Sequence, residues 1–234
     1  MKKLPSICRY MMTAVIAVVF IGRIHAAENA TVALIAKAVQ DVTKKTAPAD
    51  WTKASKGDAL ISGDQIQTGL KSLAVVKFTD NSIVRVREQS ELTITGESSR
   101  PRTLSKDVHL TKGAFGFDIK KQKQNEEFRF TSPTSVASIR GTLGSNTRGD
   151  RFTAVVVVEG LINLLNTVSK NEVDVPAGYI GFSNDDGSVS SRKATDEELA
   201  DASNLATGGS SNDINLELKD GRGNKKDLKI KFKK

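Results

Sequence analysis

The sequence has very little sulfur and few imidazole or indole side chains. It contains 1 cysteine, 2 histidines and 1 tryptophan among 234 residues. One cysteine can form neither a disulfide nor a cysteine zinc site within a single copy, so both are excluded. No apolar run reaches the roughly 20 residues that a membrane-spanning helix needs, which excludes an integral multi-pass protein. The 38% of hydrophobic residues is nevertheless enough for a buried core in one or two domains.

Residues 1–26 have the pattern of an export signal. Basic Lys2, Lys3 and Arg9 precede an uncharged, mostly apolar run over residues 11–22, and Ala26 offers a small residue for cleavage. Cleavage after Ala26 would leave a chain without cysteine, which suits an oxidising compartment. The expected location is therefore periplasmic or secreted, with membrane contact only through the transient signal. The alternative, an uncleaved anchor, stays open at this point.

Charge is unevenly distributed along the chain. The formal net charge is +8; without residues 1–26 the chain keeps 31 basic against 27 acidic residues. Residues 219–234 hold eight basic and two acidic residues, and residues 27–218 hold 23 basic and 25 acidic ones. A body so close to neutrality argues against nucleic acid as the partner. The basic tail either protects an edge strand from aggregation or binds anionic envelope polymers or lipid head groups.

Short β-branched runs separated by turn residues dominate residues 30–190. Residues 73–78 and 83–86 are two such runs, and Asp80 and Asn81 between them favour a tight hairpin turn. Residues 154–158 are apolar at every position, which predicts the most buried strand of the sheet. The pattern predicts an all-β domain over residues 30–190.

The ends of the body follow other patterns. The spacing of Val32, Ile35, Val39 and Val42 fits either one face of a helix or a strand. Thr195 and Glu198 form a capping box that predicts a short helix, followed by a flexible linker, within residues 191–212. Alternating apolar residues predict a basic β-hairpin over residues 213–234. An isolated hairpin is marginally stable, so its apolar face needs a surface to dock on.

A series of motifs resembles the FecR-type domain, in the order found in that family. The first half contains Trp51, Gly57-Asp58, Gly63-Asp64, Thr68-Gly69 and the run Phe78-Thr79-Asp80-Asn81-Ser82. The second half contains Lys112-Gly113, Thr131-Ser132-Pro133-Thr134, Ile139-Arg140-Gly141-Thr142 and Val158-Glu159-Gly160. The resemblance extends over roughly residues 39–178.

The resemblance implies an extracytoplasmic all-β domain, either solenoid-like or an irregular β-sandwich. The family is named for an iron-citrate signalling regulator, in which a cytoplasmic anti-sigma segment and a membrane helix precede the domain. Here an export signal stands at that place, so we expect only the sensing or binding half of that function. The resemblance itself identifies no ligand.

The motif residues also have structural interpretations. Turns or close backbone approaches explain the glycines, namely Gly57, Gly63, Gly69, Gly141 and Gly160. Bonds to turn amides explain Asp58 and Asp64, and the hydroxyls of Thr68 and Thr142 are expected to satisfy backbone groups. Trp51 is expected to pack in the core or at its rim, rather than to form a platform for a ligand. Arg140, if buried, needs a carboxylate from Asp58, Asp64 or Glu159, and we hypothesise such a pair.

The sequence offers little catalytic chemistry. Beyond residues 1–26 it keeps one histidine, His109, and no cysteine, so triads and histidine-rich metal sites are hard to assemble. We therefore expect no enzyme, cofactor or metal, but an exported binding or scaffold module whose partner is an envelope protein or an anionic envelope polymer. One alternative is a structural or adhesive component that self-associates through the terminal hairpin; a hydrolase with two converging carboxylates comes third.

Overall fold

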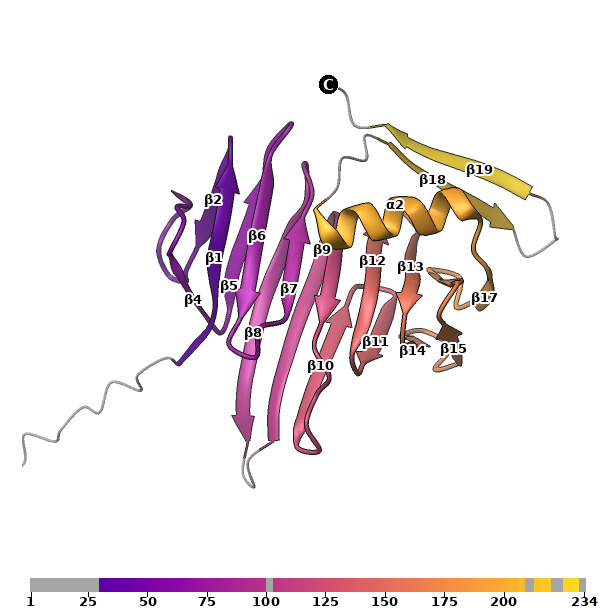
Figure 1. The fold of residues 1–234 in the computed structure, drawn as a ribbon, viewed down its shortest axis with the longest axis horizontal. Coiled ribbons are helices and arrows are strands. Elements are labelled where there is room, and N and C mark those ends of the chain that lie inside the picture. Colours follow the sequence, from indigo (N-terminus) through magenta and orange to yellow (C-terminus); the bar gives the residue numbers. More distant parts are fainter. Residues whose placement is uncertain (1–29, 100–102, 209–212, 220–224, 232–234) are drawn as a thin grey trace, which may run out of the picture.

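The computed structural model describes residues 30–99, 103–208, 213–219 and 225–231 (Figure 1). Seventeen strands join into one open sheet that folds into two layers, and a second sheet holds two further strands. The predicted all-β class is confirmed. The export signal at residues 1–26 and most of the predicted linker lie outside the described residues.

Layer A contains nine strands, all antiparallel to their neighbours. In spatial order these are β4 (Ala59–Ile61), β1 (Thr31–Val39), β6 (Leu73–Phe78), β7 (Ile83–Val86), the second half of β9 (Thr103–Ile119), β12 (Thr142–Arg148), β13 (Phe152–Glu159), β16 (Tyr179–Asn184) and β17 (Val189–Lys193). The segment from Val32 to Val42, which fitted helix or strand, therefore comprises most of β1 and the first residue of β2 (Val42–Lys45).

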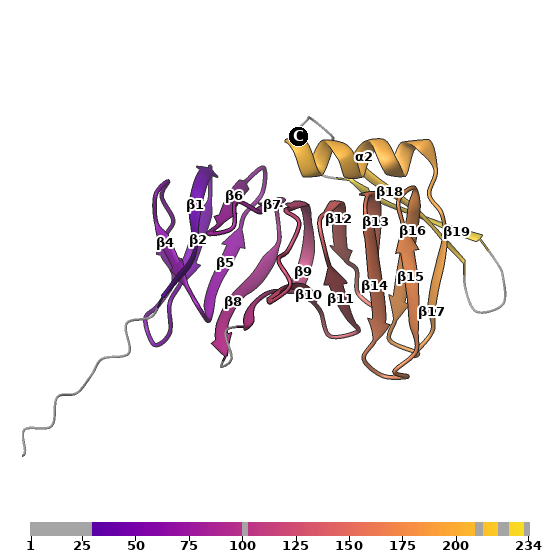
Figure 2. The same ribbon diagram turned by 60° about the horizontal axis from the view of Figure 1, so that its bottom comes forward.

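Layer B has the same number of strands and shares one of them. Its order is β3 (Thr52–Lys53), β2 (Val42–Lys45), β5 (Asp64–Thr68), β8 (Glu91–Ser99), the first half of β9, β10 (Glu126–Thr131), β11 (Ser135–Ile139), β14 (Leu161–Asn166) and β15 (Glu172–Pro176). The pairing of β9 with β10 is parallel. Apart from the edge strands β4 and β3, the strands of both layers advance along one axis in chain order (Figure 2). The fold is thus a sandwich with a solenoid-like progression.

Strand β9 passes from layer B to layer A at Gly113. Before this glycine β9 pairs with β8 and β10, and after it with β7 and β12. Gly113 has φ +88, and a Cβ built on it would lie 2.2 Å from the Ser90 hydroxyl. That hydroxyl in turn accepts a hydrogen bond from the Ala114 backbone amide at 3.0 Å. Only glycine fits this crossing without strain.

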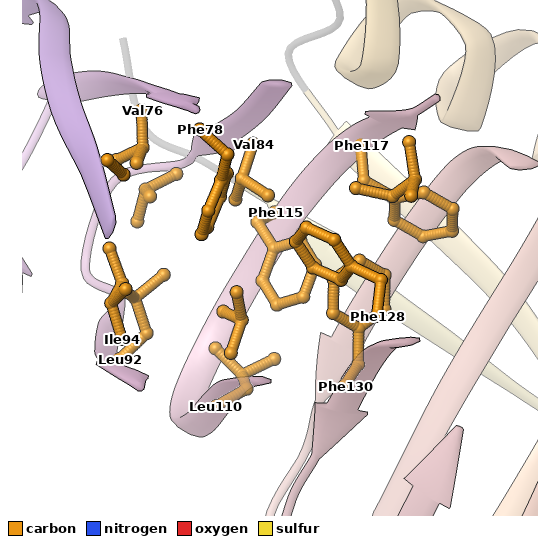
Figure 3. Packing of buried hydrophobic residues seen from close by; sticks show 14 of the residues in the cluster. Val76, Phe78, Val84, Leu92, Ile94, Leu110, Phe115, Phe117, Phe128 and Phe130 are labelled. Atoms are coloured by element: carbon orange, nitrogen blue, oxygen red, sulfur yellow. The ribbon is translucent and has the colours of Figure 1, made fainter. Parts of the chain in front are cut away.

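Aromatic side chains join the two layers at the centre of the core (Figure 3). Phe78 of layer A lies edge-on to Phe128 of layer B, with ring centroids 4.9 Å apart. Phe115 of layer A meets Phe130 of layer B at 4.8 Å in the same edge-on geometry. These rings are fully or almost fully buried. Edge-to-face pairs of this kind add about 0.5–1.5 kcal/mol each beyond the burial of their area.

Strand β13 is buried on both faces, as its apolar run predicts. Val155 and Val157 face the core between the layers. Ala154 and Val156 point to the other side, where they pack with residues of helix α2 (Asp196–Thr207). The predicted capping box is present, because Glu198 and Thr195 each bind the backbone amide of the other.

Helix α2 lies close against the outer face of layer A. A Cβ on Gly116 of β9 would lie 2.2 Å from the Leu205 backbone, so the last turn of the helix lies directly over this strand. The buried Glu198 accepts two hydrogen bonds from Arg192 at the start of the helix, and the Arg85 guanidinium donates to the Ala206 carbonyl at its end. Both ends of α2 are therefore fixed to the sheet.

The predicted terminal hairpin is confirmed by β18 (Asp213–Lys219) and β19 (Lys225–Lys231), which pair only with each other among the described strands. Strand β18 lies beside α2 (Figure 1). No helix in the described part of the chain combines the length and apolar character that crossing a membrane requires.

Candidate functional site

The motif residues lie in separate turns along the sandwich. Trp51 precedes β3, and Pro133 lies between β10 and β11. Four short groups occupy other turns or strand ends: Gly57 and Asp58, Gly63 and Asp64, Thr68 and Gly69, and Arg140 to Thr142 with Glu159 and Gly160. The last group brings together motif residues from two turns that are distant in sequence. A Cβ on Gly160 would lie 2.6 Å from the Gly141 carbonyl oxygen, and the Thr142 hydroxyl donates to the Leu161 carbonyl.

The polar motif residues bond to backbone groups, as their structural interpretation predicts. The carboxylates of Asp58 and Asp64 accept hydrogen bonds from the amides of Ser55 and Ile61, at 3.0 and 2.9 Å. The Thr68 hydroxyl accepts from the Ser90 amide at 3.0 Å. These contacts fix turns and carry no chemistry of their own.

Arg140 does not form the buried ion pair that we hypothesised. Its side chain is exposed at the end of β11. Asp58 pairs instead with Lys44 at 3.2 Å, Asp64 holds its own turn, and Glu159 is exposed. The prediction was wrong because Arg140 follows the inward-facing Ile139 and so points away from the core. Trp51 is also exposed, at 37%.

A buried lysine that the motifs did not reveal forms a charge pair inside the sandwich. Lys106 of β9 is 1% exposed, and its ammonium lies 2.8 Å from the Asp80 carboxylate. Asp80 also accepts hydrogen bonds from the Gln122 side chain and the Ser82 amide. Burial raises the pKa of Asp80, but these bonds and the lysine charge outweigh it and hold the pKa below its usual value. Lys106 shares the period-two spacing of the apolar Val108 and Leu110, and this spacing is the sequence signal that its side chain faces the core.

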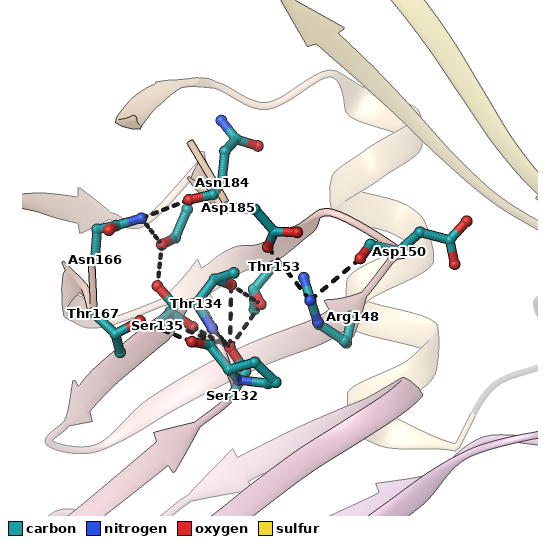
Figure 4. A network of polar contacts seen from close by, with 12 residues as sticks. Ser132, Thr134, Ser135, Arg148, Asp150, Thr153, Asn166, Thr167, Asn184 and Asp185 are labelled. Atoms are coloured by element: carbon teal, nitrogen blue, oxygen red, sulfur yellow. Dashed lines mark hydrogen bonds and ion pairs between the residues drawn. The ribbon is translucent and has the colours of Figure 1, made fainter. Parts of the chain in front are cut away.

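A network of buried hydroxyl and amide groups links the layers near the C-terminal edge (Figure 4). The Thr153 hydroxyl of layer A lies 2.8 Å from that of Ser132 and 2.9 Å from that of Thr134, next to layer B. Asn166 donates to the Ser183 hydroxyl, which in turn donates to the Thr134 carbonyl. Because each of these buried groups has a partner, the network specifies how the layers align.

The outer face of layer B, here called the layer B face, carries mainly polar side chains. Two rows cross it: Thr95, Asp107, Arg129, Ser138, Asn163 and Asp174, and next to them Gln65, Thr93, His109, Thr131, Val136, Leu165 and Glu172. No helix formed by the described residues lies over this face, whereas α2 covers part of layer A.

Four side chains at the centre of the layer B face form a cluster in which some polar atoms have no hydrogen-bond partner. They are those of Asp107, His109, Arg129 and Thr131. The Thr131 hydroxyl donates to Asp107 at 3.0 Å and lies 3.0 Å from His109 Nδ1. Arg129 donates to the Ser105 hydroxyl at 3.3 Å. Asp107 Oδ1 and Arg129 Nε are buried without a protein partner. Burial raises the pKa of Asp107, although the Thr131 hydrogen bond and the charges of Arg129 and His109 oppose the rise.

This cluster is the best candidate for a binding site. Buried polar atoms without a protein partner and a perturbed carboxylate are features that concentrate at functional positions. Within residues 30–99, 103–208, 213–219 and 225–231, no group of three or more histidine, cysteine or acidic side chains could hold a metal ion. The atoms of the cluster that lack a protein partner, Asp107 Oδ1 and Arg129 Nε, are an acceptor and a donor of hydrogen bonds.

Comparison with known proteins gives a family match and a distant structural likeness. Residues 64–163 match the family model described as FecR protein. Two crystal structures of a protein from Parabacteroides distasonis ATCC 8503, provisionally described as an anti-sigma factor, align with a TM-score of 0.48 and 12% sequence identity. The alignment covers 58% of this chain and 62% of that protein. No curated protein matches the sequence.

Replacing the buried carboxylate of Asp80 tests the Lys106 pair. We expect Asp80→Asn to lower the free energy of unfolding by about 3 kcal/mol at pH 7, because the buried ammonium loses its counter-charge. Because the folded pKa of Asp80 is lowered, the difference should persist above the ordinary aspartate pKa of about 3.9 and shrink at lower pH. Urea unfolding at several pH values measures both effects.

The matched control is Asp118→Asn, because Asp118 pairs with the exposed Lys120 at 2.9 Å. An exposed pair contributes at most about 1 kcal/mol. Equal losses in the two variants would contradict a special role for the buried pair.

Replacing Asp107 should have the opposite effect on stability. Because the pKa of Asp107 is raised in the folded protein, its ionised form costs stability above that pKa. We expect Asp107→Asn, which can still accept from Thr131, to raise the free energy of unfolding at pH 7. The gain should vanish below about pH 4, where aspartate is protonated in both states. A loss of stability at pH 7 would show that Asp107 serves the fold.

Proposed function

Because this chain carries a FecR-type domain over residues 64–163, we propose that it is an exported, non-enzymatic binding or scaffold module of the cell envelope. The proposal assigns it recognition without catalysis. Its partner is an envelope protein or an anionic envelope polymer, and its binding surface is the layer B face.

The observation that carries this proposal is the difference between the two outer faces. Helix α2 packs on layer A over apolar residues such as Ala154 and Val156. The layer B face instead exposes a broad polar surface on rigid strands, with Asp107 and Arg129 at its centre. A site on strands keeps its geometry better than one on loops. A partner that donates to Asp107 Oδ1 and accepts from Arg129 Nε would complete the cluster.

Export is supported by the sequence of residues 1–26, with its basic start, apolar run and small residue at position 26. The composition that follows, without cysteine, fits a periplasmic or secreted protein. Fractionation of cells should therefore recover a product shortened by the mass of residues 1–26 outside the cytoplasm.

Site-specific crosslinking tests the proposed face. A photo-crosslinking residue at Ser138, which is exposed in the centre of the layer B face, should capture a defined envelope component in living cells. The same residue at Ala200, on the exposed side of α2, is the matched control. Adding Arg129→Ala should weaken capture at position 138 by removing a donor of the cluster. Equal capture at both positions would refute the layer B face as the binding surface.

A second candidate function is a structural component that self-associates. The hairpin β18–β19 favours it, because each strand pairs only with the other among the described strands and leaves one edge open. Open edges are templates for pairing with another chain. Light scattering over a range of concentrations should then show oligomers that disappear when residues 213–234 are deleted. A concentration-independent monomer would exclude this function.

A further inference from the structure

One end of the sandwich, here called the turn end, gathers exposed cations from segments distant in sequence. It comprises the β6–β7 turn (residues 79–82), the β9–β10 loop (residues 120–125) and the β11–β12 turn (residues 140–141). Lys120, Lys121, Lys123 and Arg140 are all exposed there. Lys120 pairs with Asp118, whereas the other three form no ion pair within the described residues.

The backbone that carries these cations is held firmly. The Lys120 amide donates to the Ser82 hydroxyl at 3.1 Å. The Gln122 side chain donates both to the Asp80 carboxylate at 3.0 Å and to the Lys120 carbonyl at 2.7 Å. Asp80 is itself fixed by the buried Lys106. The loop is therefore anchored to the buried Lys106–Asp80 pair.

The β11–β12 turn lies directly against this loop. Gly141 adopts φ +70, and a Cβ built on it would stand 3.2 Å from Lys121 Cα. This contact places the backbone of the β11–β12 turn, which carries Arg140, next to that of Lys121. The neighbours of Arg140 serve the fold, since Ile139 is buried and Thr142 bonds to Leu161. The charge of Arg140 has no such role.

We propose that the turn end binds phosphate groups presented repeatedly along an envelope polymer or on a lipid surface. Several cations on adjoining rigid turns repel one another and concentrate anions around them. Separate charges favour a ligand with several anionic groups over a single small anion. The planar guanidinium of Arg140 can bind two oxygens of one phosphate, while the lysines act as point charges. This surface is distinct from the layer B face, and its test is independent of the function proposed above.

Charge reversal with a matched control tests the proposal on the full chain. The test variant carries Lys121→Glu, Lys123→Glu and Arg140→Glu. The control carries Lys53→Glu, Lys56→Glu and Lys193→Glu, three exposed lysines elsewhere on the surface with the same change in net charge. The probes are inorganic polyphosphate, and phosphatidylcholine vesicles with and without phosphatidylglycerol. Thermal unfolding of each variant establishes that it folds.

We expect the test variant to lose at least about tenfold in affinity for a phosphate probe, and the control to lose less than about threefold. Arg140→Lys should fall between wild type and the test variant. Preference for polyphosphate or for the vesicles identifies the source of the phosphate. Equal losses in test and control variants, or no binding by the wild type, would overturn the proposal. Tighter binding of poly-glutamate than of either phosphate probe would overturn it in favour of an acidic protein segment.

Discussion

The continuity of β9 through both layers is the constraint on which the sandwich depends. Residues before Gly113 complete layer B and residues after it complete layer A, so neither layer can shift without the other. The aromatic contacts between Phe78 and Phe128 and between Phe115 and Phe130 are possible only in that register. One glycine conformation thus determines which apolar rows face each other.

Polar groups divide into those that serve this architecture and those that remain available. Lys106 and Asp80 serve the fold, since the Asp80 carboxylate is the counter-charge of the buried Lys106 ammonium. The cluster around Asp107 and the cations around Arg140 have no comparable role. The raised carboxylate pKa of Asp107 costs stability at neutral pH, and binding of a partner would offset that cost.

The sequence predicts the local structure well where a single periodicity or cap decides it. The two-sided apolar run of β13, the turn at Asn81 with φ 66 and the capping box of α2 all follow from neighbours along the chain. The Val32 segment, whose spacing fitted either a helix or a strand, is a strand because it pairs with β6 and packs on the core. The assignment of Arg140 to a buried pair failed for a different reason: the register of β11 against its neighbours is a property of the assembled sheet. The Asp107 cluster needs the parallel pairing of β9 and β10, which no local pattern encodes.

Helix α2 has a mechanical consequence for the whole domain. Strands in the sandwich pair with partners that are near in the sequence, and such quasi-linear arrays unfold in pieces unless something couples distant units. Through Arg192 and Glu198 at one end and Arg85 at the other, the helix bridges units that share no strand pairing, across a separation of 121 residues between Arg85 and Ala206. Because α2 contacts both halves of the sandwich, unfolding of one half removes contacts that stabilise the other.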